Sequence, residues 1–292
     1  MFNLYGKVAA ITGAASGIGR CLSLALAREG CNLALADINK EGMEETIRLV
    51  RNEAPSIKVT SYVVDVASRE QMSKFADDTV HDHGGVDVII NNAGSVITGT
   101  LESITYEDFE RLMNINFWGV VYGSMAFLPY LRKRPQGHIV NLSSIFGLVG
   151  SPNVGTYCAT KFAVRGYTET LYQELRDTSV GVTCIHPGGI RTGFAQHAKI
   201  SGMVHKQSIS MEDYLDMYGR LRFITRPETA AKRALEGIKK NKKRVVIGID
   251  AKGVDLVARL FPKLQSSIMR ILDDAYIKVW PFVKGPMGKF GL

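Results

Sequence analysis

Short runs of β-branched and other apolar residues alternate with longer segments of helical spacing along the first two-thirds of the chain. Apolar runs of this length predict strands, and apolar positions three and four residues apart predict helices that bury one face. The predicted strands are Lys7–Thr12, Asn32–Ala36, Lys58–Val63, Val86–Ile90, Gly137–Leu142, Val180–His186 and Arg244–Ile247. The predicted helices are Ile18–Glu29, Lys40–Glu53, Ser68–His83, Thr105–Arg132, Gly155–Asp177 and Arg226–Lys240. This alternation predicts an α/β fold, a single doubly wound domain with a seven-stranded parallel sheet covered by helices on both faces.

Two segments interrupt this rhythm. Residues 194–225 mix polar residues with Met203, Met211, Tyr214, Met217 and Tyr218, and we predict a helical substrate lid there. Residues 251–292 carry an apolar stripe beside basic residues, with Pro262 in a position to divide the segment into two helices. The stripe comprises Leu256, Leu260, Leu264, Ile268 and Ile271, and the basic neighbours are Arg259, Lys263 and Arg270. We therefore predict a catalytic domain at 1–250 and a basic, amphipathic, helical C-terminal extension at 251–292.

Composition supports a folded chain in a reducing setting. Of the 292 residues, 46% are hydrophobic and 22% charged, which excludes a disordered protein. The four cysteines form no CxxC pair, and the N-terminus lacks the features of a secretion signal, so a cytoplasmic location is expected. No apolar run approaches the roughly 18 residues that a spanning helix needs.

The excess positive charge lies at one end of the sequence. The net charge is +8, and residues 239–292 contain 12 Lys or Arg against 4 Asp, so the remainder is neutral. The cluster Lys239–Arg244 has no interleaved aromatic residues, which argues against a nucleic-acid partner. For the extension three roles stay open: peripheral contact with a membrane surface, cover of a substrate cleft, or a subunit interface. The aromatic residues at Trp280–Phe282 are those that would enter a membrane surface.

A glycine-rich turn follows the first predicted strand and opens the first predicted helix. Gly13, Ser16, Gly17, Ile18 and Gly19 belong to this turn. Backbone N–H groups at a helix N-terminus bind phosphate, and glycines allow close approach to the pyrophosphate of a dinucleotide. The turn therefore predicts a Rossmann-type dinucleotide site.

Asp37 ends the second predicted strand, where a carboxylate can accept hydrogen bonds from the adenosine ribose hydroxyls. Ile38 and Asn39 follow it, and Ser16 precedes Gly17, so no nearby cation is available for a 2'-phosphate. We therefore expect a preference for NAD over NADP.

Further motifs follow the glycine turn in a fixed order. They are Asn91-Asn92-Ala93-Gly94, Ser144 thirteen residues before Tyr157, Tyr157-x-x-x-Lys161, and Pro187-Gly188-Gly189-Ile190-Arg191-Thr192. With these motifs the chain resembles the short-chain dehydrogenase/reductase (SDR) family over about residues 5–248. The extension is similar to those of family members that act on retinoids, steroids or long-chain alcohols.

The resemblance implies a catalytic set. Tyr157 would be the acid/base, Lys161 its activator, Ser144 the partner of the substrate oxygen, and Asn116 part of a proton relay. Tyr157 and Lys161 share a helix face, and an ammonium a few ångströms away favours phenolate by up to about 4 kcal/mol, roughly three pK units. We therefore expect the pKa of Tyr157 to be lowered.

The resemblance also implies further cofactor contacts. Asp65 and Val66 would contact adenine, Asn92, Ala93 and Gly94 would lie beside the adenosine, and Pro187, Gly188, Ile190 and Thr192 would lie near the nicotinamide, with Tyr157 and Lys161. His186 is expected to be structural, and the histidines and cysteines show no spacing typical of a metal site.

The expected reaction is interconversion of an alcohol and its ketone or aldehyde by hydride transfer with NAD(H). Apolar residues near the reacting groups, Val96, Phe146 and Leu148 with Ser144 and Tyr157, favour a small lipophilic substrate. Two alternatives remain: a 3-oxoacyl thioester reductase that uses NADPH, and an NAD-binding regulatory or membrane-surface protein without turnover. The family usually pairs its two long helices between subunits, so a homodimer or homotetramer is expected.

Overall fold

A seven-stranded parallel sheet forms the centre of the protein, which is described by a computed structural model for residues 2–194, 199–200 and 224–283. The strands are β1 (Val8–Thr12), β2 (Asn32–Asp37), β3 (Val59–Val63), β4 (Val88–Asn91), β6 (Gly137–Leu142), β7 (Val180–Pro187) and β9 (Arg244–Ile247). Their order across the sheet is β3-β2-β1-β4-β6-β7-β9, with all pairs parallel. The predicted α/β class and doubly wound sheet are confirmed.

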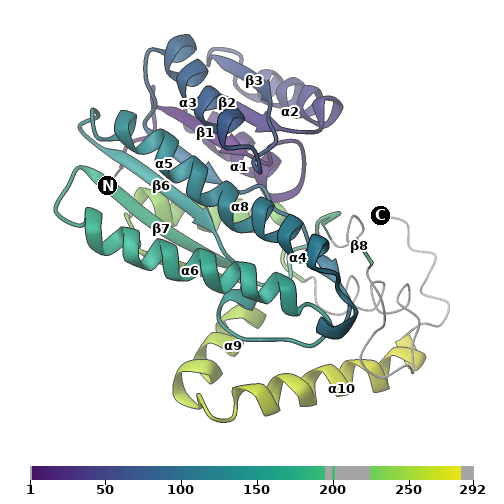
Figure 1. Ribbon diagram of the computed structural model, residues 1–292. Coiled ribbons are helices and arrows are strands. Elements are labelled where there is room, and N and C mark those ends of the chain that lie inside the picture. The colour runs from purple at the N-terminus through teal and green to yellow at the C-terminus, as the bar shows by residue number, and fades with distance from the viewer. Residues whose placement is uncertain (1, 195–198, 201–223, 284–292) are drawn as a thin grey trace.

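Helices cover both faces of this sheet (Figure 1). One core contains side chains of α1 (Gly17–Arg28), α2 (Lys40–Glu53) and α8 (Pro227–Lys239). The other contains side chains of α3 (Arg69–His83), α5 (Gly119–Leu131) and α6 (Gly155–Leu175). Because both faces are covered, every residue of β1, β4 and β6 is buried, which explains why these strands read as continuous apolar runs rather than as alternating ones.

The helix predicted at Thr105–Arg132 is interrupted. The structure has α4 (Tyr106–Met113), a π-helical segment η2 (Asn114–Trp118) and α5 in succession. A π turn inserts one residue into an otherwise regular helix, so the apolar spacing used for the prediction does not reveal it.

Several short elements were not predicted. They are β5 (Ile97–Thr98), which pairs with β8 (Lys199–Ile200), and the 3-10 turns η1 (Leu101–Ser103) and η3 (Ile145–Gly147). Each has too few residues to establish a period. The methionines and tyrosines of the predicted lid lie outside the described residues.

Two helices follow β9 at the lower end of the molecule in Figure 1. They are α9 (Ile249–Leu260) and α10 (Gln265–Val283), and the break between them contains Pro262, as predicted. No helix among the described residues is long and apolar enough to cross a membrane.

Candidate active site

A cleft of about 660 Å³ opens at the carboxyl ends of the parallel strands. It lies where the strand order reverses between β1 and β4, the place at which open α/β sheets bind ligands. Most residues predicted for the site line this cleft: Gly13, Ser16, Gly17, Ile18, Asp37, Asp65, Val66, Asn92, Ala93, Gly94, Val96, Ser144, Phe146, Tyr157, Lys161, Pro187, Gly188, Ile190 and Thr192. The fold therefore gathers residues from the ends of six strands into one continuous wall.

Three predicted residues lie behind that wall. Gly19 and Asn116 are buried beneath it, and Leu148 is 5% exposed and does not line the cleft. The chain turns through η3 before Leu148, so this side chain packs inward while Phe146 lines the cleft. The prediction that Leu148 is a substrate contact is not supported by its position.

The glycine turn is shaped so that larger residues do not fit. Gly13 (φ +67°) and Gly17 (φ +53°) have left-handed backbone conformations that favour glycine. A Cβ on Gly19 would lie 2.0 Å from the carbonyl oxygen of Gly13. Asn92 stabilises the turn, because its Nδ2 donates to the carbonyl oxygens of Thr12 and Gly13, each at 3.0 Å. The turn leaves backbone atoms and the N-terminus of α1 facing the cleft, as a pyrophosphate requires.

Asp37 lies beside this turn. Its Oδ2 accepts from the N–H of Ala15 at 2.9 Å, and its Oδ1 accepts from the N–H of Asn39 at 3.0 Å. Each carboxylate oxygen keeps lone-pair capacity for a further hydrogen bond from a ribose hydroxyl. The guanidinium of Arg20, the residue that follows the glycine turn, donates to the carbonyl oxygens of Ala15 and Gly42 and to the Thr46 hydroxyl. Lys40, three residues after Asp37, does not line the cleft.

Asp65 follows β3 at the same end of the cleft. Its Oδ1 accepts from the N–H of Ala67 at 2.9 Å, and its own N–H donates to the side chain of Gln71 at 2.8 Å. These bonds fix the turn that presents Asp65 and Val66 to the cleft. The cleft wall therefore has the carboxylates of Asp37 and Asp65 at one end, where they can accept hydrogen bonds, and the glycine turn beside them. This arrangement fits a dinucleotide, with its adenosine at the carboxylates and its pyrophosphate at the glycine turn.

Ser144, Tyr157 and Lys161 converge at the other end of the cleft. Ser144 precedes the turn η3 as its N-cap, with its hydroxyl accepting from the N–H of Phe146, and Tyr157 and Lys161 are one turn apart on α6. Lys161 Nζ lies 5.6 Å from the centre of the Tyr157 ring and donates to the carbonyl oxygen of Leu142 at 2.9 Å. Neighbouring Ser143 is committed elsewhere, since its hydroxyl donates to the carbonyl oxygen of Lys161 at 2.9 Å.

Burial controls the acid–base properties of this group. Burial raises the pKa of Tyr157 above its ordinary value, and the side chain of Ser144 lowers it by a smaller amount. Burial also lowers the pKa of Lys161 to about 8. The expectation of a lowered tyrosine pKa is therefore wrong for the protein without its cofactor, because desolvation outweighs an ammonium that bonds to Leu142 rather than to the phenol.

Asn116 lies in the π-helical segment η2 and is fully buried. Its Oδ1 accepts from the N–H of Ser95 at 2.8 Å, while its Nδ2 donates to the carbonyl oxygen of Ser95 at 2.9 Å and to the Thr160 hydroxyl at 3.0 Å. A Cβ on Gly94 would lie 3.1 Å from Asn116 Oδ1 and 3.6 Å from Lys161 Nζ. Asn116 thus fixes the wall beside Lys161, and its part in a proton relay stays a prediction.

Aromatic side chains flank the Tyr157 ring. The ring of Phe146 lies 6.3 Å away in an edge-on arrangement, and the ring of Phe194, at the start of the predicted lid, lies 6.0 Å away. Val96 and Ile224 also line this part of the cleft. The surroundings of the tyrosine hydroxyl are therefore largely apolar.

Four residues of the C-terminal helices line the cleft and were not predicted for the site: Asp250, Val254, Met269 and Leu272. Asp250 Oδ2 accepts from the N–H of Gly189 at 2.6 Å and so attaches α9 to the turn that follows β7. The predicted stripe did not identify these residues. Of its members, Leu256, Leu260, Leu264 and Ile271 are more than half exposed and Ile268 is half-buried, because apolar spacing along a helix does not show which face packs against the rest of the fold. The extension therefore lines the cleft, and its contact with a membrane surface or with a second subunit stays a prediction.

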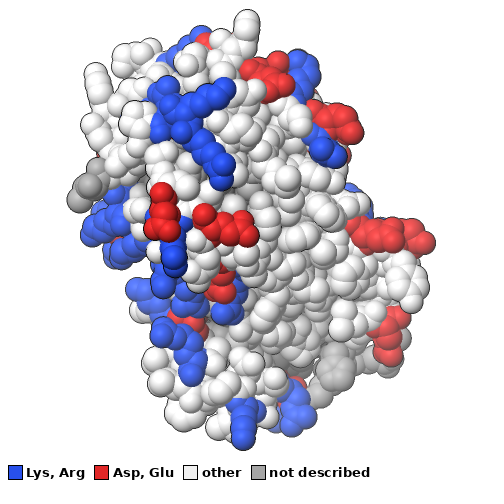
Figure 2. All heavy atoms as spheres, turned by 60° about the vertical axis from the view of Figure 1, so that its left-hand side comes forward, with Lys and Arg blue, Asp and Glu red and all other residues white. Residues whose placement is uncertain are grey.

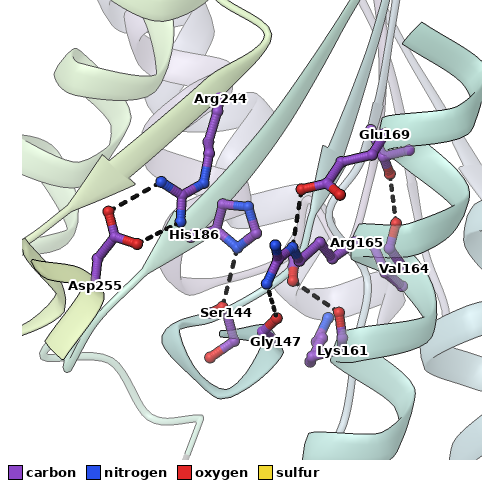
Figure 3. A network of polar contacts seen from close by, with 11 residues as sticks. Ser144, Gly147, Lys161, Val164, Arg165, Glu169, His186, Arg244 and Asp255 are labelled. Atoms are coloured by element: carbon purple, nitrogen blue, oxygen red, sulfur yellow. Dashed lines mark hydrogen bonds and ion pairs between the residues drawn. The ribbon is translucent and has the colours of Figure 1, made fainter. Parts of the chain in front are cut away.

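A network of polar side chains lies beside the turn η3 and extends from the buried His186 to the exposed Glu169 (Figure 3). Arg244 on β9 forms paired hydrogen bonds with Asp255 on α9 at 2.9 and 2.6 Å. His186 on β7 lies 3.1 Å from the carbonyl oxygen of Ser144, and burial lowers its pKa to about 4. Arg165 on α6 binds Glu169 at 2.8 Å and reaches the carbonyl oxygen of Gly147. His186 is thus a neutral residue that supports the turn, in agreement with the structural role expected for it.

The model of the short chain dehydrogenase family matches residues 7–201. The chain belongs to the short-chain dehydrogenase/reductase family. It is 41% identical over 286 residues to SadH of Mycobacterium tuberculosis, a protein named as an oxidoreductase, and the match covers 97% of this chain and 100% of SadH. It is 37% identical to the 3-ketodihydrosphingosine reductase of Bacteroides thetaiotaomicron, over 76% of this chain and 77% of the relative.

Among solved structures, a short-chain dehydrogenase/reductase from Burkholderia phymatum in complex with NAD has a TM-score of 0.82 and 28% identity. The match covers 91% of this chain and 97% of that chain. This chain therefore has an SDR fold, and it is an oxidoreductase that uses a nicotinamide cofactor. The match to SadH extends through the C-terminal helices, so the extension belongs to a shared architecture.

Proposed function

We propose that this protein interconverts a lipophilic alcohol and its ketone or aldehyde with NAD(H). The observation that carries the proposal is the convergence of Ser144, Tyr157 and Lys161 in an apolar part of the cleft, opposite the glycine turn. The nicotinamide supplies or accepts the hydride when the cofactor is bound. The protein's own residues must then orient the carbinol carbon and transfer one proton.

Tyr157 is the residue that we assign to proton transfer. Its phenolate oxygen takes the proton of the alcohol during oxidation, and the resulting hydroxyl returns a proton to the carbonyl oxygen during reduction. Ser144 holds the same oxygen by a hydrogen bond in both directions. The pKa of Lys161 is about 8, so the side chain is mainly protonated below pH 8. Its positive charge favours the phenolate form of Tyr157.

NAD is the cofactor that the cleft favours over NADP. Of the described residues that line the cleft, Lys161 and Arg111 are the cationic ones, and both belong to helices on the far side of β1 from Asp37. A 2'-phosphate beside Asp37 would therefore meet a carboxylate without a compensating cation. The NAD complex of the Burkholderia relative supports the same assignment.

The lipophilic class of the substrate is inferred from the walls around Tyr157. Phe146, Phe194, Val96 and Ile224 line this end of the cleft, and the extension adds Val254, Met269 and Leu272. Such walls favour apolar ligands with a single polar group. The Bacteroides relative, which is named a 3-ketodihydrosphingosine reductase, is in keeping with this assignment.

A panel of hydrophobic primary and secondary alcohols, assayed with NAD and with NADP, tests the proposal. We expect turnover with NAD and a kcat/KM at least tenfold lower with NADP. Equal efficiency with the two cofactors would reject the NAD preference. Efficient reduction of 3-oxoacyl thioesters with NADPH would favour the alternative reductase, and absence of any turnover would favour the regulatory alternative.

We also infer a homodimer or homotetramer formed through the long helices. Trp118, Met125 and Phe162 are large apolar residues of η2, α5 and α6 that are 40% exposed or more. Light scattering on purified protein tests this, and a monomer at micromolar concentration contradicts it. Cytoplasmic location and peripheral membrane contact of the extension stay predictions, the latter tested by salt-sensitive cosedimentation with anionic vesicles.

A further inference from the structure

A second cavity, of about 260 Å³, lies between α9, α10 and the loop at Val149. Four of its lining residues, Asp250, Val254, Met269 and Leu272, also line the main cleft. The two spaces therefore share one wall, built by residues of the C-terminal extension. Asp250 connects this wall to the turn that follows β7, because its carboxylate accepts a hydrogen bond from the N–H of Gly189.

The chemistry of the second cavity is apolar and nearly uncharged. Val257 and Ile268 face it from the two helices, both half-buried, while Met269 is 6% exposed. Asp250 is the charged residue among the described lining. Its Oδ2 accepts from the N–H of Gly189, while its Oδ1 is buried without a hydrogen-bond partner among the described residues. No lysine or arginine of the described chain lines the cavity, so a carboxylate or phosphate has no counter-charge there. The lining suits an uncharged hydrocarbon chain.

The second cavity adjoins the main cleft near Tyr157. The helix α9 packs against η3, whose Phe146 flanks the Tyr157 ring. An apolar chain that extends from Tyr157 along the C-terminal helices would therefore meet the residues that line both spaces, Val254, Met269 and Leu272.

We propose that the cavity between α9 and α10 binds the alkyl tail of a long-chain alcohol or ketone whose oxygen is held by Ser144 and Tyr157. This inference rests on the proposed function and adds to it the class of substrate. It also gives the C-terminal extension a specific task, selection by chain length. Val254 and Met269 lie at the junction of the two spaces, and Val257 and Ile268 lie farther along the tail.

A homologous series from 2-butanol to 2-decanol, assayed with NAD, tests the proposal. In the natural protein we expect kcat/KM to rise by about fourfold for each added methylene until the cavity is filled. Val257→Trp should block the cavity and lower the ratio of kcat/KM for 2-decanol to that for 2-butanol by at least tenfold. Gly253→Leu provides a second block with little risk to folding, because a Cβ at Gly253 meets no atom within 4 Å.

Leu256→Trp is the matched control. Leu256 precedes Val257 on α9, is 58% exposed and lines neither cavity, so the same new side chain there should leave the ratio unchanged. A ratio that is equally high in the natural protein, Val257→Trp and Gly253→Leu would overturn the proposal.

Calorimetric binding of 2-decanol to the NADH-loaded protein gives a readout that needs no turnover. We expect Val257→Trp to weaken this binding at least tenfold and Leu256→Trp to leave it unchanged. If no alcohol is oxidised but this pattern of binding holds, the proposed reaction fails and the tail site stands. If alcohols are oxidised without dependence on length and 2-decanol binding is the same in all variants, the tail site fails and the proposed reaction stands.

Discussion

The Nδ1 atom of His186 lies 3.1 Å from the main-chain carbonyl oxygen of Ser144. A carbonyl oxygen only accepts, so Nδ1 carries the hydrogen and Nε2 is left as an acceptor. Nε2 has no hydrogen-bond partner among the described residues, and neither has Nε of Arg244, a donor that lies close by in the same network (Figure 3). The Ser144 carbonyl oxygen, at the start of the turn η3, therefore has two donors: a buried, neutral histidine and the N–H of Gly147.

Replacing this histidine should destabilise the protein. His186→Leu fills a similar volume but removes one of the two donors to the Ser144 carbonyl oxygen, which keeps the N–H of Gly147, so we expect a loss of about 1 kcal/mol of the free energy of unfolding. Urea denaturation measures the change. His81→Leu, at a histidine with an 88% exposed side chain, is the control and should change stability little. An unchanged free energy for His186→Leu would show that the contact adds nothing.

Stability should fall as the pH is lowered from about 7 to 4. Burial lowers the pKa values of His138 and His186 to about 4, whereas both histidines titrate near 6.5 when the chain is unfolded. Between these pH values the unfolded state binds more protons, so acid favours unfolding, by a few kcal/mol for each histidine. Urea denaturation at a series of pH values measures the slope. His138→Gln should reduce it, and an identical slope in that variant contradicts the assignment.

Removal of the Tyr157 hydroxyl should abolish proton transfer while the cofactor still binds. We expect Tyr157→Phe to lower kcat by about 10²–10⁴-fold, the usual contribution of a positioned acid or base. The dissociation constant of NADH, measured by fluorescence, should stay nearly the same. Tyr167→Phe, at another tyrosine of α6, should keep full turnover. A kcat within tenfold of the natural value would refute the role given to Tyr157.

Asp37→Ala should shift the cofactor preference. Loss of charged hydrogen bonds to the ribose hydroxyls should lower kcat/KM with NAD by about 10–100-fold, while the penalty on the 2'-phosphate of NADP disappears. Asp65→Ala is the control, because its predicted contact is to adenine, which both cofactors contain. It should weaken both cofactors alike. A NAD/NADP ratio that does not change in Asp37→Ala would argue that specificity lies elsewhere.

Gly19→Ala should disrupt the cofactor turn from behind. Its Cβ would lie 2.0 Å from the Gly13 carbonyl oxygen, and backbone atoms must move to accept it. We expect at least a tenfold loss of NADH affinity and a lower melting temperature. Gly166→Ala on α6, where a Cβ meets no atom within 4 Å, should leave affinity unchanged and stability equal or slightly higher. Unaltered NADH binding in Gly19→Ala would mean that the turn tolerates the methyl group.

Local sequence patterns were sufficient to predict the sheet, its covering helices and most of the residues that line the cleft. Buried parallel strands are continuous apolar runs, and the glycine turn and the Tyr157–Lys161 spacing are local patterns that need no knowledge of distant residues. Ser144 stays the predicted partner of the substrate oxygen, and the hydroxyl of neighbouring Ser143 bonds to the Lys161 carbonyl oxygen. Among the described elements, several strand and helix ends, the π turn and the shortest elements were misplaced or missed.

The tertiary structure alone decided the contacts between residues far apart in the chain. Asp250 reaches Gly189 across 61 residues, and Val254, Met269 and Leu272 bring the C-terminal helices to the cleft, although none of these three residues belongs to the apolar stripe predicted from the sequence. The raised pKa of Tyr157 likewise depends on how many atoms from other elements surround it. Local spacing specifies which side chains share a helix face, whereas desolvation and long-range packing depend on the whole fold.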